Sequence, residues 1–389
     1  MSTTSAPTPP APSAPSVGTA SGSSTGRKPL TFAYWVPTVS GGLVVSNVEQ
    51  RTDWSYEYNV ELARAAERAG FEYALTQVRY LASYGAANQH ESTSFSLALL
   101  AATEKLKVIA AVHPGMWQPG VLAKFLTTAD HVSGGRAAVN VVSGWLKDEF
   151  VRMGEPWLEH GERYRRAEEF IRYLREVWTS DEANLAGDFY RLRDFNMQPK
   201  PLALPGRAHP EIFMGGNSSD ARGMGARVAD WYFMNGASFD AAEEQVNDVS
   251  ARAAEQGRTV KFGLNGFVIA RDTEAEARAQ LAEIIERADR PAVEGFAAAV
   301  KQAGASTADK KGMWADSELA DLVQYNDGFR TGLVGTPEQI AHRLLEYRRR
   351  GVDLVLCGFL HFVEEVEHFG REVLPIYREL EAAELERVA

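Results

Sequence analysis

The stretch that decides the fold runs from Arg136 to Phe170 and reads RAAVNVVSGWLKDEFVRMGEPWLEHGERYRRAEEF. A run rich in Ala and Val at 137–142 meets a polar turn at Ser143–Gly144, and a loop and a strongly charged helical pattern follow. Five polar residues lie at or beyond the end of this run: Asn140, Ser143, Glu149, Arg163 and Tyr164. Parallel α/β barrels place polar groups there for ligand binding and chemistry. The stretch therefore predicts a strand–loop–helix unit with part of a functional site at its mouth.

This unit recurs along the chain from residue 31 onward. Apolar runs typical of buried parallel strands alternate with amphipathic helical patterns, for example at 55–69, 119–131, 162–178, 273–288 and 336–350. The strand candidates are 31–36, 73–78, 106–112, 137–142, 211–216, 230–235, 262–270 and 353–359. Eight such units predict an α/β fold closed as a (β/α)₈ TIM barrel. A doubly wound open sheet is the alternative, and the lack of a GxGxxG turn after the first run disfavours it.

Three segments depart from this rhythm. Residues 1–28 are rich in Ser, Ala and Pro, and we expect a disordered tail there, with a single barrel domain over 29–389. Residues 182–205 predict a small hairpin followed by a Pro-rich crossing. Residues 289–331 look irregular and contain GASTADKKG, and a loop of that length in a compact domain is typically a lid or disordered. We therefore expect a mobile insertion near 289–331.

Composition excludes several classes of function. The chain has 389 residues, 45% of them hydrophobic, which is enough for a large core. Its net charge of −11, with both signs interspersed, makes nucleic acid and anionic membranes poor partners. The sequence holds no apolar stretch near the ~18 residues of a membrane span. The single cysteine, Cys357, excludes an intrachain disulfide and cysteine-cluster metal sites, and suits a reducing cytoplasm.

One motif is typical of phosphate binding. MGGNSSDARGMGA (214–226) ends a strand candidate and opens a helical pattern. Gly215 and Gly216 allow close backbone approach, and Ser218 and Ser219 place hydroxyls beside the free N–H groups of a helix N-terminus. A plain serine N-cap is the other interpretation. Arg163 and Tyr164 can reach the same phosphate, or lie on a solvated charged helix face.

Further candidates follow other strand runs. Arg79 lies near the predicted mouth, where it can hold an anion or a polarised oxygen. His90, His113 and His361 are each either structural or part of the site. The sequence contains neither HxH nor HExxH, so we expect no metal. Aromatic side chains near strand ends either line a water-excluding pocket or fill the top of the barrel. They include Trp35, Tyr84 and Phe359.

Several motifs, taken in order, resemble one family. FAYWVP, ALTQVR, VNVVSGW, HGERYRRAEEF, GGNSSDA, LVGTPEQIA and GVDLVLCGFLHF are similar to motifs of the bacterial luciferase-like superfamily, across about residues 30–380. Within it, the chain most resembles the two-component flavin monooxygenases. YWVPTVSGGLVVS (34–46), QHES (89–92), VQYNDGF (323–329) and GFLHF (358–362) are most like those of members that oxidise dimethyl sulfone.

That resemblance implies the chemistry and the partners. The expected reaction cleaves a C–S bond of dimethyl sulfone with O₂ and reduced FMN, giving methanesulfinate and formaldehyde. A separate NAD(P)H-dependent FMN reductase would supply the FMNH₂, and we expect a homodimer or homotetramer. The implied FMN contacts are Val78, Arg79, Asn140, Ser143, Glu149, Arg163, Tyr164, Gly216, Ser218 and Ser219. The implied catalytic residues are Arg79, His90, His113, His361 and Arg330, with Trp35, Tyr84 and Phe359 in the substrate pocket.

Other members of the superfamily give the alternatives. Alkanesulfonate monooxygenases carry a cysteine, a histidine and a tyrosine where this chain has positions near Gln89, Phe267 and Phe359. This difference predicts a less polar pocket, which suits a neutral sulfone better than a sulfonate. Pyrimidine-ring-opening oxygenases share the FMN motifs, and deazaflavin-dependent reductases share the barrel. A flavin-binding protein without turnover is the non-enzymatic alternative.

Overall fold

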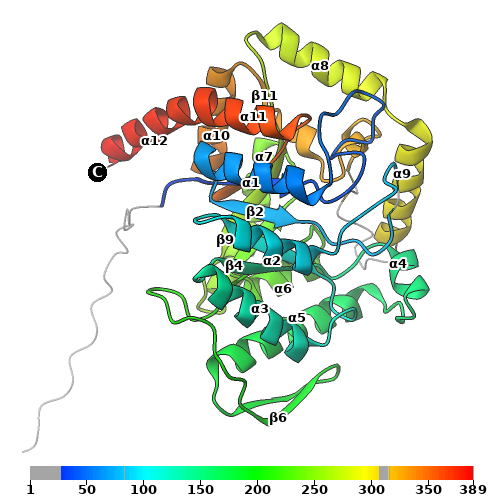
Figure 1. Cartoon of the computed structure of the whole chain (residues 1–389), viewed down its shortest axis with the longest axis vertical. Coiled ribbons are helices and arrows are strands. Elements are labelled where there is room, and N and C mark those ends of the chain that lie inside the picture. Colours follow the sequence, from blue (N-terminus) through cyan, green and yellow to red (C-terminus); the bar gives the residue numbers. More distant parts are fainter. Residues whose placement is uncertain (1–27, 83, 306–313, 315, 389) are drawn as a thin grey trace, which may run out of the picture.

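The eight apolar runs form the strands of one closed barrel, which confirms the predicted fold and rules out the open sheet. This computed structural model (Figure 1) describes residues 28–82, 84–305, 314 and 316–388. The strand order in the barrel is β1-β12-β9-β8-β7-β4-β3-β2. Every pairing in the barrel is parallel. The strands are β1 (Thr31–Val36), β2 (Tyr73–Thr76), β3 (Lys107–Val112), β4 (Ala137–Val141), β7 (Glu211–Gly215), β8 (Trp231–Met234), β9 (Lys261–Phe267) and β12 (Leu354–Gly358).

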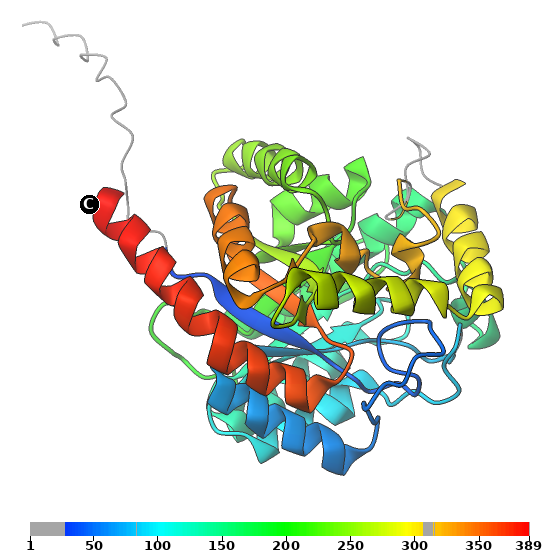
Figure 2. The same ribbon diagram turned by 90° about the horizontal axis from the view of Figure 1, so that it is seen from above.

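Helices surround the barrel (Figure 2). They are α1 (Tyr56–Ala69), α2 (Ser92–Ala102), α3 (Pro119–Ser133), α5 (His160–Thr179), α6 (Ser219–Val228), α7 (Phe239–Ala254), α10 (Pro337–Arg349), α11 (Phe362–His368) and α12 (Leu374–Val388). A π-helical turn (Phe369–Val373) joins the last two. Local sequence sets their ends: the Ser55 hydroxyl accepts from the Tyr58 N–H at the start of α1, and Gly70, at φ 96°, ends it. Among the described residues, no helix is long and apolar enough to cross a membrane.

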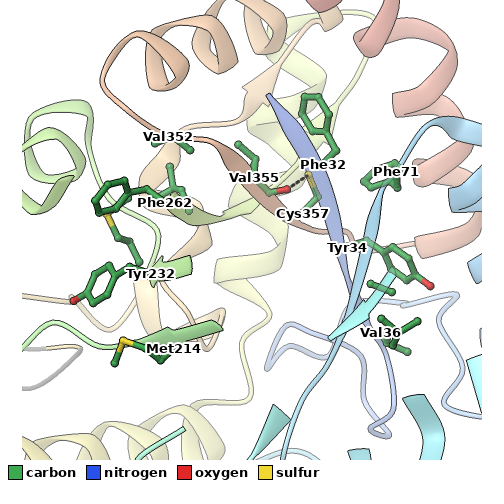
Figure 3. Packing of buried hydrophobic residues seen from close by; sticks show 14 of the residues in the cluster. Phe32, Tyr34, Val36, Phe71, Met214, Tyr232, Phe262, Val352, Val355 and Cys357 are labelled. Carbon is green, nitrogen blue, oxygen red and sulfur yellow. Dashed lines mark hydrogen bonds between the residues drawn. The ribbon is translucent and has the colours of Figure 1, made fainter. Parts of the chain in front are cut away.

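Alternation along β1 shows how the strands separate two layers of core. Phe32, Tyr34 and Val36 point outward, where Phe71 and other apolar side chains fill the space between barrel and helices (Figure 3). Ala33 faces the barrel interior with side chains of the other strands. Successive side chains of a strand point to opposite faces, so a strand covered on both faces reads as a continuous apolar run. This is why the sequence pattern predicted the barrel strands.

The N-terminal end of the barrel is closed by aromatic rings and charge pairs. The rings of Phe213 and Trp231 stack with centroids 5.2 Å apart. Glu211 lies between Lys107 and Lys261, at 2.9 Å and 3.1 Å from their Nζ atoms. Burial alone would raise the pKa of Glu211, but the two lysines outweigh it and lower the pKa to about 2. Ligands therefore meet the barrel at its other end.

The two predicted insertions have different outcomes. The hairpin is confirmed as β5 (Ala183–Ala186) and β6 (Arg191–Phe195), which are antiparallel. The irregular segment predicted at 289–331 is wrong in its first half, which forms α9 (Arg290–Ala305). Val293, Phe296 and Val300 are buried along one side of α9 at helical spacing, and small residues between them obscured that pattern. The second half holds two 3₁₀ turns, Asp321–Val323 and Gly328–Thr331.

Two short paired strands join the beginning and the end of the segment between β9 and α10. The strand predicted at 262–270 ends early, because β9 stops at Phe267 and β10 (Ile269–Ala270) pairs instead with β11 (Val334–Gly335). The helix α8 (Glu274–Glu286) follows β10. Most of GASTADKKG and all but Lys28 of the predicted tail lie outside the described residues. The mobility of the insertion stays a prediction.

Candidate active site

A cavity of about 160 Å³ opens at the C-terminal end of the barrel. Each barrel strand contributes at least one lining residue. Taking one from each strand in chain order, these are Trp35, Leu75, Ala111, Asn140, Gly215, Phe233, Asn265 and Leu356. Loops and the insertion supply most of the remaining lining. The cavity therefore occupies the position where parallel barrels bind ligands.

Aromatic rings form the roof of this cavity. Phe296 of α9, Trp314 and Tyr325 come from the insertion, and Trp145 precedes the short helix α4 (Lys147–Arg152). The ring of Phe296 meets those of Trp145, Trp314 and Tyr325 edge to face, with centroids 5.4, 5.4 and 5.1 Å away. The Tyr325 hydroxyl donates to the carbonyl of Tyr84, whose ring also lines the cavity. Such a roof excludes water from the site.

Arg79 places a positive charge in this largely apolar cavity. Among the described residues that line the cavity, it is the only ionic side chain. Its guanidinium lies 4.5 Å from the centre of the Trp145 ring and donates to the Val78 carbonyl at 3.0 Å. Burial lowers the pKa of Arg79, and the charge of Glu149 partly offsets this effect. Arginine nevertheless remains protonated in proteins, so the cavity holds a buried cation.

Amide side chains supply the other polar groups of the cavity. Among the described residues, Gln77 Nε2 and Asn140 Oδ1 have no hydrogen-bond partner although both atoms are buried. Buried polar groups are normally hydrogen-bonded, so an unpaired donor and acceptor facing a cavity indicate a polar ligand. Asn265 is different, because its Oδ1 accepts from Trp35 Nε1 at 2.6 Å and its Nδ2 donates to the Asn326 carbonyl at 2.8 Å. Asn265 thus ties the barrel to the insertion.

A second group of polar residues follows Gly215, the last residue of β7. The Ser218 hydroxyl caps α6 by accepting from the Ala221 N–H, and lies 3.1 Å from His160 Nε2. At Gly216 a Cβ atom would lie 2.5 Å from the Cβ of Ala221 and 2.9 Å from the Tyr164 hydroxyl. An alanine there would collide with these protein atoms, so the close packing of this turn requires glycine. We call Gly216, Ser218, His160 and Tyr164 the cradle.

The predicted site residues fall into three groups. The cavity is lined by Trp35, Val78, Arg79, Tyr84 and Asn140. In or beside the cradle lie Arg163, Tyr164, Gly216, Ser218 and Ser219. Outside the lining lie His90, His113, Ser143, Glu149, Arg330, Phe359 and His361. The sequence therefore located the site, but it did not separate side chains that enter the cavity from those that support it.

Two histidines outside the cavity contact other parts of the protein, whereas the buried Ser143 hydroxyl has no hydrogen-bond partner among the described residues. The ring of His90 lies 4.9 Å from those of both Trp54 and Phe95. His361 Nδ1 accepts from the Arg51 N–H at 3.1 Å. His90 and His361 thus join loops and helices, because a position after a strand does not set where a side chain points. A catalytic role for either histidine stays a prediction.

The predicted place of Phe359 in the substrate pocket, and the argument that Phe267 and Phe359 make the pocket less polar, also need correction. Phe359 is buried in the apolar layer outside the barrel, 6.2 Å from Phe71. Phe267 lies in the same layer, so neither phenylalanine lines the cavity, and the predicted loss of polarity cannot rest on them. Gln89 does line it. Arg330 is half-buried and its N–H donates to the Asp327 carbonyl at 3.0 Å. A role for Arg330 stays a prediction.

Several lining residues were missed by the sequence reasoning. They are Phe233, Asn235, Asn265, Phe296, Trp314 and Tyr325. A signal existed for the two asparagines, since each interrupts an otherwise apolar strand run near its end, in WYFMN and FGLNGF. No comparable signal marked the three aromatic residues of the insertion, because their contacts to the barrel mouth depend on how the insertion folds back.

Asp327 gives the insertion a pH-dependent stability. It is 1% exposed and has left-handed backbone at φ 55°. Burial raises its pKa to about 6, although hydrogen bonds from Ser317 and Asn235 act in the opposite direction. Because this pKa lies above the ordinary value of 3.8, the stabilisation is complete below pH 3.8 and is lost as the pH rises through 6. The ionised carboxylate is therefore the unfavourable form.

Asp327→Asn is expected to stabilise the protein at pH 8 and to stabilise it about half as much at pH 5. The amide stays neutral and tolerates left-handed backbone. The difference in pKa corresponds to roughly 3 kcal/mol. Thermal unfolding at both pH values measures it, with a shift of the midpoint at pH 8 that is about twice the shift at pH 5. Asp194→Asn is the matched control, because Asp194 has similar backbone at φ 46° but is exposed. An equal shift at both pH values would contradict this reasoning.

Comparison with known proteins agrees with the barrel and its site. A model of the luciferase-like monooxygenases matches residues 30–354, and the chain belongs to this family. It is 62% identical over 354 residues to an FMNH₂-dependent dimethylsulfone monooxygenase of Pseudomonas putida, covering 91% of this chain and 97% of the relative. It is 60% identical over 356 residues to a protein of the same description from Pseudomonas fluorescens, covering 92% and 96%. A crystal structure of riboflavin lyase shares the fold, with TM-score 0.79, 20% identity and coverage of 91% and 92%.

The family implies bound FMN, and the residues present fit that group. The cradle offers the Ser218 hydroxyl and the free N–H groups of α6 to a phosphate. The unpaired Asn140 Oδ1 and Gln77 Nε2 match a heterocycle edge that carries both donors and acceptors. Gly215, which lines the cavity, directly precedes Gly216 of the cradle. Among the described residues, no group of three His, Cys, Asp or Glu side chains is placed to hold a metal.

Proposed function

We propose that this chain is an FMNH₂-dependent monooxygenase that cleaves a C–S bond of dimethyl sulfone. The products are methanesulfinate and formaldehyde, with FMN and water, so that one atom of O₂ enters formaldehyde and the other enters water. The cavity carries this proposal, since it is small and largely apolar, and Arg79 is the one charge among its described lining residues. Identity of 62% to a dimethylsulfone monooxygenase over nearly its full length supports the same substrate.

Dimethyl sulfone matches the chemistry of the cavity. It is neutral, its two oxygens only accept hydrogen bonds, and its two methyl groups are apolar. Arg79 is a donor, and the aromatic roof offers apolar surface to the methyl groups. A pyrimidine would leave hydrogen-bonding groups facing this roof. An alkanesulfonate would place its full negative charge and a longer apolar tail in a chamber of about 160 Å³.

The residues have distinct roles in this proposal. Bound reduced FMN supplies the electrons and the oxygen chemistry. The cradle holds the phosphate, and Asn140 accepts a hydrogen bond from the ring edge. Arg79 stabilises negative charge that develops on oxygen, an effect that is strong where water is excluded. Phe296, Trp314 and Tyr325 keep water out, and so protect the reaction from unproductive decay.

The partners and location follow from the same activity. We propose that a separate NAD(P)H-dependent reductase supplies FMNH₂, either by diffusion or in a transient complex. The chain assembles as a homodimer or homotetramer in this proposal, and the projecting α12 helix offers surface for such pairing (Figure 2). We place the enzyme in the cytoplasm, where NAD(P)H is available and the buried free thiol of Cys357 stays reduced.

The test is oxygen uptake together with product analysis. Dimethyl sulfone, NADH, an FMN reductase and catalase are combined with and without the protein. We expect formaldehyde and methanesulfinate in equal amounts, formed only when the protein and O₂ are both present. Oxygen uptake without formaldehyde would reject this substrate, and a panel of sulfonates and pyrimidines would follow. Substrate consumption that needs no O₂ would instead indicate a reductase.

A further inference from the structure

Three loops meet at a buried ion pair behind the cavity. Glu149 lies on α4 after β4, His113 follows β3, and both are fully buried. Glu149 Oε2 lies 3.3 Å from His113 Nε2. Within the described residues, neither of these two atoms has a hydrogen-bond partner elsewhere. The pair does not line the cavity, so its function must be exerted through a neighbour.

The hydrogen bonds of His113 determine where its protons lie. Its Nδ1 is 2.8 Å from the Val142 carbonyl, which can only accept, so Nδ1 carries a proton. Its Nε2 therefore faces the Glu149 carboxylate. Burial alone would raise the pKa of Glu149, but the interaction with His113 and the charge of Arg79 lower it. Glu149 is therefore held as a carboxylate beside the His113 ring.

The other oxygen of Glu149 holds the backbone that follows Arg79. Oε1 accepts from the N–H groups of Tyr80 and Leu81, the latter at 3.3 Å. Arg79 is thus the last residue before a turn that is clamped by a buried charge. Its guanidinium lies over Trp145, which belongs to the same β4 loop as Glu149. Hydrogen bonds to an ionised group are roughly twice as strong as neutral ones, so the clamp is firm.

We propose that Glu149, oriented by His113, is a positioning residue that sets Arg79 against the cavity. The inference rests on the proposed function, and it adds which residues hold the Arg79 guanidinium in place. The sequence resemblance implied a cofactor contact for Glu149 and a catalytic role for His113. The geometry assigns both to the support of Arg79 instead. A displacement of about 1 Å at such a group can cost 10²-fold in rate.

Glu149→Gln tests the clamp with little change in volume. A neutral amide binds the two N–H groups less firmly and presents its own N–H₂ toward His113 or toward the backbone donors. We expect faster hydrogen exchange at the Tyr80 and Leu81 amides and a roughly 10- to 100-fold lower kcat/KM for dimethyl sulfone. Asp148→Asn is the matched control, because Asp148 neighbours Glu149 on α4 but is exposed and pairs with Arg152. The Asp148→Asn variant is expected to change neither the hydrogen exchange at Tyr80 and Leu81 nor kcat/KM.

A double-mutant cycle separates positioning from general damage. In an Arg79→Ala background, Glu149→Gln is expected to change turnover by less than about 2-fold, because the group it positions is gone. Equal losses in both backgrounds, or unchanged exchange at Tyr80 and Leu81, would overturn the proposal. If Glu149→Gln does not fold, His113→Gln carries the same test with a neutral donor. If the wild-type protein makes no formaldehyde, the proposed function fails, and the exchange measurement decides the clamp alone.

Discussion

Replacing Arg79 with alanine is expected to lower kcat/KM for dimethyl sulfone by roughly 10²- to 10³-fold, with the protein still folded. Loss of one charge-stabilising donor from an active site costs about that much elsewhere. The effect is large here because Arg79 is the only ionic side chain among the described residues of the lining. It lies half-buried over Trp145, where its charge is screened less than in open solvent.

Two further variants make this prediction specific. Arg79→Lys keeps the charge but loses the planar fork that lies over the Trp145 ring, so we expect an intermediate loss. Arg371→Ala removes an exposed arginine that pairs with Glu372, and it is expected to leave turnover unchanged. Initial rates of formaldehyde release with saturating FMNH₂ measure all three. Full turnover by Arg79→Ala would show that the reaction does not need this cation. Arg79 would then not stabilise negative charge on oxygen during turnover.

The sequence predicted the barrel well because burial on both faces leaves a strong pattern. Runs such as TFAYWV and DLVLCGF are apolar at nearly every position, and their spacing matches one strand–helix unit after another. The cap at Ser55 and the glycine at Gly70 mark helix ends by local chemistry alone. These features depend on neighbours along the chain, so the chain itself reveals them.

The active site was predicted less completely because it depends on where each side chain points and on contacts between distant segments. Arg79 and His361 both follow barrel strands, yet Arg79 lines the cavity and His361 binds the backbone of Arg51. The roof depends on the insertion, where Phe296 meets Trp145 across more than a hundred residues of chain. The spacing of polar residues located the mouth of the barrel, but it could not assign each side chain to a face.

Glu149 shows why a motif residue needs its partners to be interpreted. It belongs to the same stretch as Asn140, and sequence similarity placed both against the cofactor. In the structure Asn140 lines the cavity with an unpaired oxygen, whereas both oxygens of Glu149 face the protein. A carboxylate that has three protein donors around it has little capacity left for a ligand. The distinction appears only once the three loops are brought together.

Gly216→Ala is expected to weaken binding of reduced FMN by roughly 10- to 100-fold while the barrel stays folded. The new methyl group would lie 2.5 Å from the Cβ of Ala221 and 2.9 Å from the Tyr164 hydroxyl. The turn cannot simply move away, because the Tyr232 hydroxyl donates to the Gly216 carbonyl. Overpacking of this kind costs about 1–3 kcal/mol, and each 1.4 kcal/mol is tenfold in affinity.

The backbone of Gly216 requires a matched control, since φ 151° itself disfavours alanine. Gly257→Ala provides it, because Gly257 also has positive φ, at 64°, but a Cβ atom there would have no neighbour within 4 Å. Both variants are expected to lose some thermal stability, and only Gly216→Ala should lose affinity in an anaerobic FMNH₂ titration. We expect the cradle to bind the phosphate, so equal affinities for the two variants would place the phosphate elsewhere.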